Sequence, residues 1–105
     1  MVNRAIIVND NYICFATSQQ LVPNYPGPGY PATLSAFVLS RRSDIVGGVM
    51  YLDEVPSSVG AMSILDAGLT KVVYAKPAES EDQVAAIQIL EQGDVETHYN
   101  PDIIL

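Results

Sequence analysis

Hydrophobic positions along the chain fall into short runs that are separated by turn and cap residues. An apolar run at 4–8 and a run rich in aromatic and β-branched residues at 12–17 flank Asn9-Asp10-Asn11, and together they predict an antiparallel hairpin. Further short apolar runs with turn residues at their ends predict three more strands, at 45–52, 69–75 and 95–99. The pattern therefore predicts five strands.

Between these strands the apolar residues recur at helical spacing, which predicts helices at 33–42, 56–67 and 80–92. Gly68 follows the second predicted helix as a C-terminal stop, and Ser80-Glu81-Asp82-Gln83 is a capping box that starts the third. Strands that alternate with helices imply parallel crossovers. We therefore expect one α/β domain over residues 1–105, with a mixed five-stranded sheet and helices packed on it.

Residues 22–31 interrupt this alternation. The stretch holds prolines at four positions between glycines and tyrosines, and no regular element persists through so many missing N–H donors. We expect an ordered loop or lid here. Tyr25 and Tyr30 flank its centre, where their rings could stack on a base or contact a protein.

Composition excludes several classes of protein. Hydrophobic residues make up 49% and charged residues 16% of the 105 residues, so the chain can form a core. No apolar run approaches the roughly 20 residues that span a bilayer, and the start of the chain lacks the pattern of a signal peptide. Cys14 is the single cysteine, so no intrachain disulfide forms. We expect a cytoplasmic protein that does not interact with membranes.

Charge is distributed unevenly along the chain. The formal net charge is −7, and residues 77–105 hold acids but no Lys or Arg. Nucleic-acid binding depends on cationic side chains that displace counterions from phosphates, and this chain has few of them. We therefore expect no nucleic-acid partner. The acidic last third is typical of a solvated face that favours solubility.

Two stretches carry a resemblance to a known family. Val49-Met50-Tyr51, Pro56-Ser57 and the run from Gly68 to Tyr74 resemble the "MY", "PCxxC" and "GI-x-x-VVY" blocks of deoxycytidylate deaminases, and Pro31-Ala32-Thr33 looks like their "HAE" block. The chain thus resembles the zinc-dependent cytidine and deoxycytidylate deaminase family. This resemblance implies a three-layer-like sandwich of a mixed five-stranded sheet with helices, without the helix that usually precedes the hairpin.

In that family a histidine and two cysteines hold Zn²⁺, and a glutamate moves protons between water and the base. On the matched positions this chain carries Pro31 for the histidine, Thr33 for the glutamate, and Ser57 and Gly60 for the cysteines. None of the four supplies a good zinc ligand or a base near pH 7. Cys14 and His98 are too few and too scattered to replace them. The resemblance therefore implies no metal, no cofactor and a chain that is not an enzyme.

Ser57 and Ser58 allow two interpretations. Either serine can cap the helix that follows, which is the interpretation we favour. As a nucleophile, a serine needs an adjacent base, for which His98 is the single histidine, and no triad signature accompanies the pair.

Three functions stay open at this point. The first is an interaction or assembly module that pairs with itself, with an active relative or with an unrelated protein, as the apolar end Ile103-Ile104-Leu105 and the low charge favour. The second is binding or sequestration of a nucleotide or another small molecule in the emptied pocket, and the third is a different reaction in the same cleft. Candidate binding residues for the pocket are Ser18, Gln19, Tyr25, Tyr30, Ser57 and Ser58.

Overall fold

The structure is a computed structural model that describes residues 3–17 and 32–103. It begins with an antiparallel hairpin of β1 (Arg4–Asn9) and β2 (Tyr12–Thr17), in which Ile7 lies opposite Cys14. The turn is tight because Asp10 adopts a left-handed conformation, with φ 49°, which Asp tolerates better than most residues. The predicted hairpin is confirmed.

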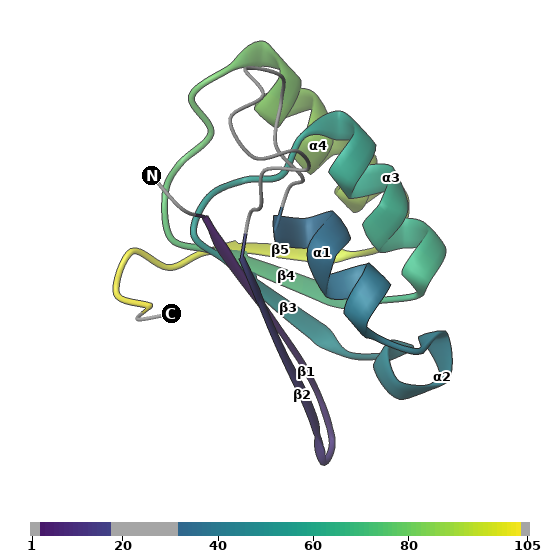
Figure 1. The fold of residues 1–105 in the computed structure, drawn as a ribbon. Helices are drawn as coiled ribbons and strands as arrows, with labels where there is room; N and C mark the ends of the chain where they lie inside the picture. Colours follow the sequence, from purple (N-terminus) through teal and green to yellow (C-terminus); the bar gives the residue numbers. More distant parts are fainter. Residues whose placement is uncertain (1–2, 18–31, 104–105) are drawn as a thin grey trace, which may run out of the picture.

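The hairpin is one side of a five-stranded sheet in the order β2-β1-β3-β4-β5 (Figure 1). Strand β3 (Val49–Leu52) pairs antiparallel with β1 and parallel with β4 (Lys71–Tyr74). Strand β5 (Glu96–Tyr99) continues the parallel part on the far side of β4. The sheet is therefore mixed, as expected.

In the described residues, four helices accompany the sheet: α1 (Ala32–Leu39), α2 (Arg42–Ile45), α3 (Ser58–Ala67) and α4 (Glu81–Gln92). Ser57 caps α3 and Ser80 caps α4, each by accepting a hydrogen bond of 3.1 Å from the amide three residues later. Gly68 ends α3 in the left-handed conformation, with φ 79°. The predicted caps and the predicted glycine stop are confirmed.

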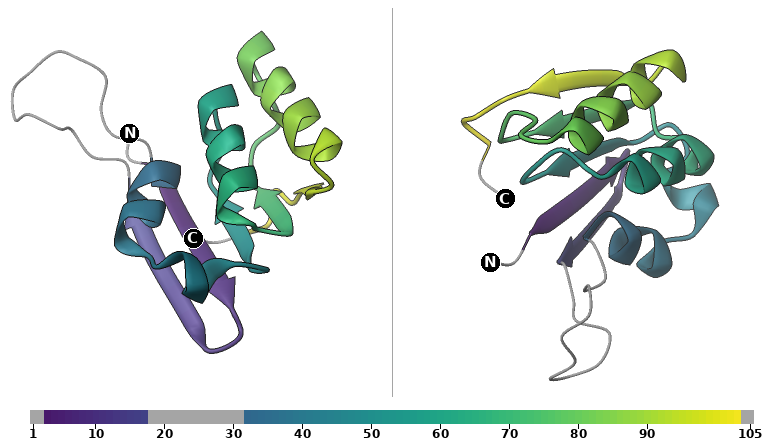
Figure 2. Two further views of the ribbon diagram at one scale, coloured as in Figure 1. Left: turned by 90° about the vertical axis from the view of Figure 1, so that its right-hand side faces the viewer. Right: turned by 90° about the horizontal axis from the view of Figure 1, so that it is seen from above.

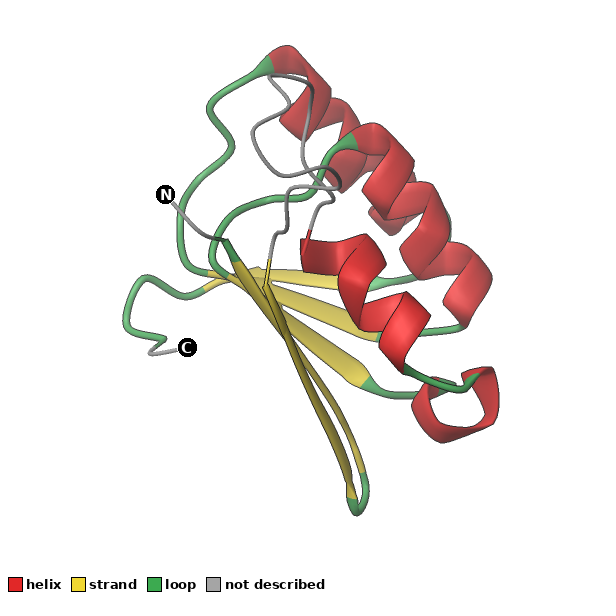
Figure 3. Cartoon of the chain, in the orientation of Figure 1, coloured by secondary structure: helices red, strands yellow, loops and turns green. Residues whose placement is uncertain are grey.

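The helices found within residues 32–103 lie on one side of the sheet (Figures 1, 2 and 3). The connections β3–α3–β4 and β4–α4–β5 add parallel strands in the same direction, and crossovers of one hand then place both helices on one face. The buried core lies between this face and the helices. Its strand members are Ala5, Ile7, Cys14, Ala16, Met50, Leu52 and Val72, and its helix members are Ala36, Ile45, Ala61, Ile64, Ala86 and Leu90.

The observed fold agrees with the predicted class and refines it. A mixed five-stranded sheet with helices is confirmed, whereas the described residues form two layers, because no described helix covers the other face of the sheet. The strand predicted at 45–52 begins only at Val49, since Gly47 turns the chain at φ 83° and α2 precedes it. None of the helices in the described ranges is long and apolar enough to cross a membrane.

Candidate functional site

Three of the four positions singled out by the deaminase resemblance lie together where α1 and α3 begin. Thr33 is on the first turn of α1, Ser57 caps α3, and Gly60 is on its first turn. A Cβ atom built on Gly60 would lie 3.5 Å from Ser57 Oγ and 3.8 Å from Thr33 Cγ2. The fold therefore assembles this cluster from two helices that are far apart in the sequence. Pro31, the fourth position, lies outside the described residues.

The side chains of the cluster perform structural roles. Thr33 is buried, at 5% exposure, and its methyl group faces Gly60. Ser57 is exposed, and its hydroxyl oxygen accepts the amide hydrogen of Gly60. This bond confirms the interpretation of Ser57 as an N-cap. The nucleophile interpretation would need His98 beside Ser57. His98 lies on β5 in register with Val73, whose side chain points away from the helices, so these two residues do not form a serine–histidine pair.

Ser58 is held by a second contact, from the start of α4. Asp82 accepts hydrogen bonds from the Ser58 amide at 3.1 Å and from the Ser58 hydroxyl at 2.7 Å. These two bonds lower the pKa of the Asp82 carboxyl, the hydroxyl bond contributing most. A carboxylate at a helix N-terminus also interacts favourably with the helix dipole. The first turn of α3 therefore already carries a negative group, and the amides of Ser58 and Gly60 are both engaged.

The donor atoms of the cluster do not fit a zinc ion. Zinc sites in proteins use thiolate, imidazole or carboxylate ligands, and Thr33, Ser57 and Gly60 offer two hydroxyls and no such group. Within residues 3–17 and 32–103, no three His, Cys, Asp or Glu side chains are placed to hold a metal. Cys14 is buried in the core, where its thiol lies 3.8 Å from the carbonyl oxygen of Ala36. We derive no chemical step through zinc at these positions.

The other binding residues expected from the sequence are divided between the two parts of the chain. Ser57 and Ser58 lie in the cluster just described. Ser18, Gln19, Tyr25 and Tyr30 lie outside the described residues, as does the whole predicted loop at 22–31.

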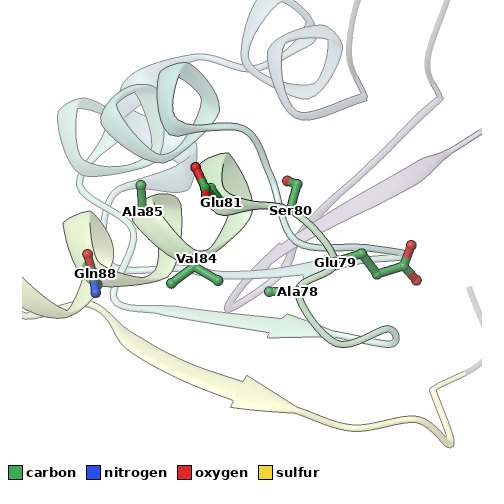
Figure 4. Close-up of a pocket in the computed structure, with 7 residues that line it drawn as sticks. All are labelled: Ala78, Glu79, Ser80, Glu81, Val84, Ala85 and Gln88. Carbon is green, nitrogen blue, oxygen red and sulfur yellow. The ribbon is translucent and has the colours of Figure 1, made fainter.

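A shallow depression of about 420 Å³ lies on α4 and the loop before it (Figure 4). Val84, which is 47% exposed, contributes its apolar part, and Glu79 and Glu81 contribute carboxylates. Its remaining lining residues are small or polar: Ala78, Ser80, Ala85 and Gln88. The depression is open and lacks a buried polar group, so it has little to fix a ligand in one orientation.

The feature that sequence reasoning missed is the face of the sheet opposite the helices. The strand registers place two rows of side chains across it, which we call the helix-free face. The first row is Phe15, Ile6, Tyr51, Val73 and His98, and the second is Ile13, Val8, Val49, Lys71 and Glu96. Apart from His98, Lys71 and Glu96, every member is apolar or aromatic. Phe15 and Ile13 are 69% and 56% exposed, although side chains of this kind are usually buried.

Charges on and beside the helix-free face are paired with one another. Lys71 Nζ lies 3.4 Å from Glu96 Oε2 within the second row. Arg4 shares the orientation of Ile6 on β1, and its Nε lies 3.6 Å from Asp53 Oδ2. The two positive and two negative groups cancel. In a chain of net charge −7, this face therefore carries no net charge of its own.

A signal for this face was present in the sequence. On β2 both sets of alternating positions are apolar, Ile13 and Phe15 as well as Cys14 and Ala16, which predicts burial on two sides. Two of the predicted helices connect neighbouring parallel strands through crossovers of the same handedness. Such crossovers place both helices on the same face of the sheet, so the other face is left uncovered by them.

Comparisons with known proteins agree with this fold. No family model matches the sequence, and no curated protein matches it. Among solved structures, the dCMP deaminase of cyanophage S-TIM5 in complex with dCMP and dUMP superposes with a TM-score of 0.74 and 20% identity, over 94% of this chain and 80% of that one. RibD of Acinetobacter baumannii gives 0.73 and 21%, over 93% of this chain but 28% of its own. A tRNA:A34 deaminase gives 0.62 and 15%, over 94% of this chain and 82% of its own.

The chain therefore has the cytidine and deoxycytidylate deaminase-like fold, as the sequence resemblance implied. The expectation that it is not an enzyme is contradicted, because solved structures that share the fold are deaminases by name. That expectation was inferred from the substitutions at all four matched positions, Pro31, Thr33, Ser57 and Gly60. Those substitutions concern only the side chains at the four matched positions, whereas the fold as a whole is shared with deaminases.

Proposed function

We propose that this deaminase-fold chain is an interaction or assembly module that associates with a protein surface through its helix-free face. The observation that carries the proposal is a set of apolar side chains aligned across four strands on the helix-free face, of which Phe15 and Ile13 on β2 are the most exposed. A sheet whose two faces are both apolar is stable when both are covered. Fully burying a phenylalanine or isoleucine contributes about 1.5–3 kcal/mol, so two such side chains favour association strongly. We place this function in the cytoplasm, consistent with a single, buried cysteine.

Binding of a nucleotide at the Thr33–Ser57–Gly60 cluster has less support. A nucleotide phosphate binds at a helix start by accepting hydrogen bonds from unpaired backbone amides. At the start of α3, however, the amides of Ser58 and Gly60 already donate to Asp82 and Ser57. The Asp82 carboxylate would also repel an anion at this place.

Light scattering coupled to size exclusion, together with binding of an uncharged polarity-sensitive dye, tests the association function. The purified chain should either exceed the 11.3 kDa of one copy or, when diluted to a monomer, bind the dye. Phe15→Glu should reduce the dye signal of the monomer several-fold, because it places a charge in the exposed apolar row.

Val59→Glu is the matched control. Val59 is 58% exposed on α3, on the helix side of the sheet, and the substitution adds the same charge. Its dye signal should equal that of the unmodified chain. A monomer whose dye signal is the same with and without Phe15→Glu would contradict the proposed function.

A further inference from the structure

We propose that the helix-free face is an interface between two copies of this chain, which pack sheet against sheet. The inference rests on the proposed association function and names its partner. Face-to-face sheets pack about 10 Å apart, with the side chains of the two inner faces interdigitated. The two apolar rows of the helix-free face present the alternating residues that such packing requires.

The width of the face favours a second sheet over a single helix. Five strands at about 4.8 Å spacing form a surface about 24 Å wide. A helix with its side chains is about 10–12 Å across, so one helix would cover about half of this width and leave the remaining strands in water. A second copy presents a sheet of the same width and covers the whole face.

The charge distribution favours a second copy over a charged partner. Two chains of net charge −7 repel each other in most orientations. On the helix-free face, however, Lys71 is paired with Glu96 and Arg4 with Asp53, so two copies can meet here without bringing unpaired acids together. A strongly basic partner would find no unpaired carboxylate among these four groups.

The exposed fractions indicate where the contact is centred. Val73, in the middle of β4, is 5% exposed, whereas Phe15 and Ile13 on β2 are 69% and 56% exposed. The apolar area left in water is therefore largest on the hairpin. We expect the Phe15 and Ile13 side chains to contribute most of the association energy, since few residues dominate most interfaces.

The size of the face predicts the strength of the pairing. Strands of four to six residues are about 13–20 Å long, and with the width this gives a footprint of about 400 Å² on each copy. Two copies then bury about 800 Å² or somewhat more, which is below the roughly 1,200 Å² of stable interfaces and in the range of weak, transient ones. We therefore expect a dimer that dissociates on dilution, with a dissociation constant in the range of about 1–100 µM.

Sedimentation equilibrium over a concentration series tests the inference. The unmodified chain should be a dimer at high concentration and a monomer at low concentration. Phe15→Glu and Ile13→Glu should each weaken the dimer at least tenfold. Val59→Glu and Met62→Glu are the matched controls, because these side chains are 58% and 53% exposed on α3, and they should leave the dimer unchanged.

Hydrogen exchange of β2 separates face-to-face packing from pairing of two β2 edges. In the face-to-face dimer the outward amides of β2 exchange at the same rate in monomer and dimer, whereas strand-to-strand pairing would protect them and overturn the inference. A dimer that persists in Phe15→Glu and Ile13→Glu would also overturn it, while leaving the proposed assembly function intact. If the chain is monomeric up to about 1 mM and the dye still binds the apolar face, the dimer inference is wrong, whereas the proposed association function stands.

Discussion

At the scale of single residues, the start of α3 depends on two serines with separate partners. Ser57 accepts the amide hydrogen of Gly60, and Ser58 donates to Asp82. Residue identity in the sequence was enough to predict the cap, because Ser before a helical run is a strong N-terminal signal. The contact with Asp82 was not predictable, since it joins residues 24 positions apart in the chain.

Removal of the cap should lower the free energy of unfolding. Ser57→Ala leaves the Gly60 amide without its side-chain acceptor, and we expect a loss of about 1 kcal/mol, or about 4 °C in Tm. Thermal unfolding followed by circular dichroism measures it. Ser63→Ala on the same helix is the control, because the Ser63 hydroxyl donates only to the Val59 carbonyl, which already accepts a helix bond. Equal losses in the two variants would show that Ser57 does not act as a cap.

The Asp82 contact predicts a dependence on pH. The pKa of the Asp82 carboxyl is lowered by Ser58, so the stabilisation is present above the ordinary carboxyl pKa and is lost as the pH falls through the lowered value. In Ser58→Ala the Asp82 pKa should rise, which a carbon-13 NMR titration of its carboxyl group measures. Ser57→Ala, which does not contact Asp82, should leave it unchanged. An unchanged pKa in Ser58→Ala would contradict the assignment.

At the scale of elements, the connection from α2 to β3 is set by close packing of backbone. Gly48 sits where a Cβ atom would lie 2.9 Å from the carbonyl oxygens of Ile45 and Val8. The sequence pattern predicted a strand at 45–52 that contains both Gly47 and Gly48. The strand starts later because the chain must turn at Gly47 and then pass close to β1, a requirement that only the packed elements reveal.

Gly48→Ala should therefore be costly. The two carbonyl oxygens belong to backbone that is hydrogen-bonded in place, so we expect a loss of about 2–3 kcal/mol in the free energy of unfolding. Gly47→Ala is the matched control, because no atom lies within 4 Å of its Cβ position and only the positive φ is unfavourable. Its expected cost is about 1 kcal/mol. Chemical denaturation of both variants measures the difference, and a Gly48→Ala loss no larger than that of Gly47→Ala would be inconsistent with this packing.

At the scale of the whole molecule, an apolar face and a large net charge have opposite effects on self-association. The apolar rows favour contact between copies, and the charge of −7 opposes it. Salt screens the repulsion between copies while leaving apolar burial intact.

Added salt should therefore strengthen the dimer. Between about 0.05 M and 0.5 M NaCl we expect the dissociation constant to fall several-fold, because the screening length decreases across this range. Sedimentation equilibrium at each concentration measures it. Phe15→Glu should associate at least tenfold more weakly at every salt concentration, which excludes salting-out of another surface. Weaker association at high salt would instead indicate ion pairs across the interface.

The sequence by itself determined the local elements of this protein. The hairpin, the serine caps and the glycine stop follow from interactions within a few residues, and the alternation of strands and helices determined the α/β class. The tertiary structure decided which distant residues meet: Thr33 with Gly60, Ser58 with Asp82, and the two apolar rows that cross the sheet. Strand register and crossover hand decide these contacts, and both depend on packing of the whole chain, which local sequence does not encode.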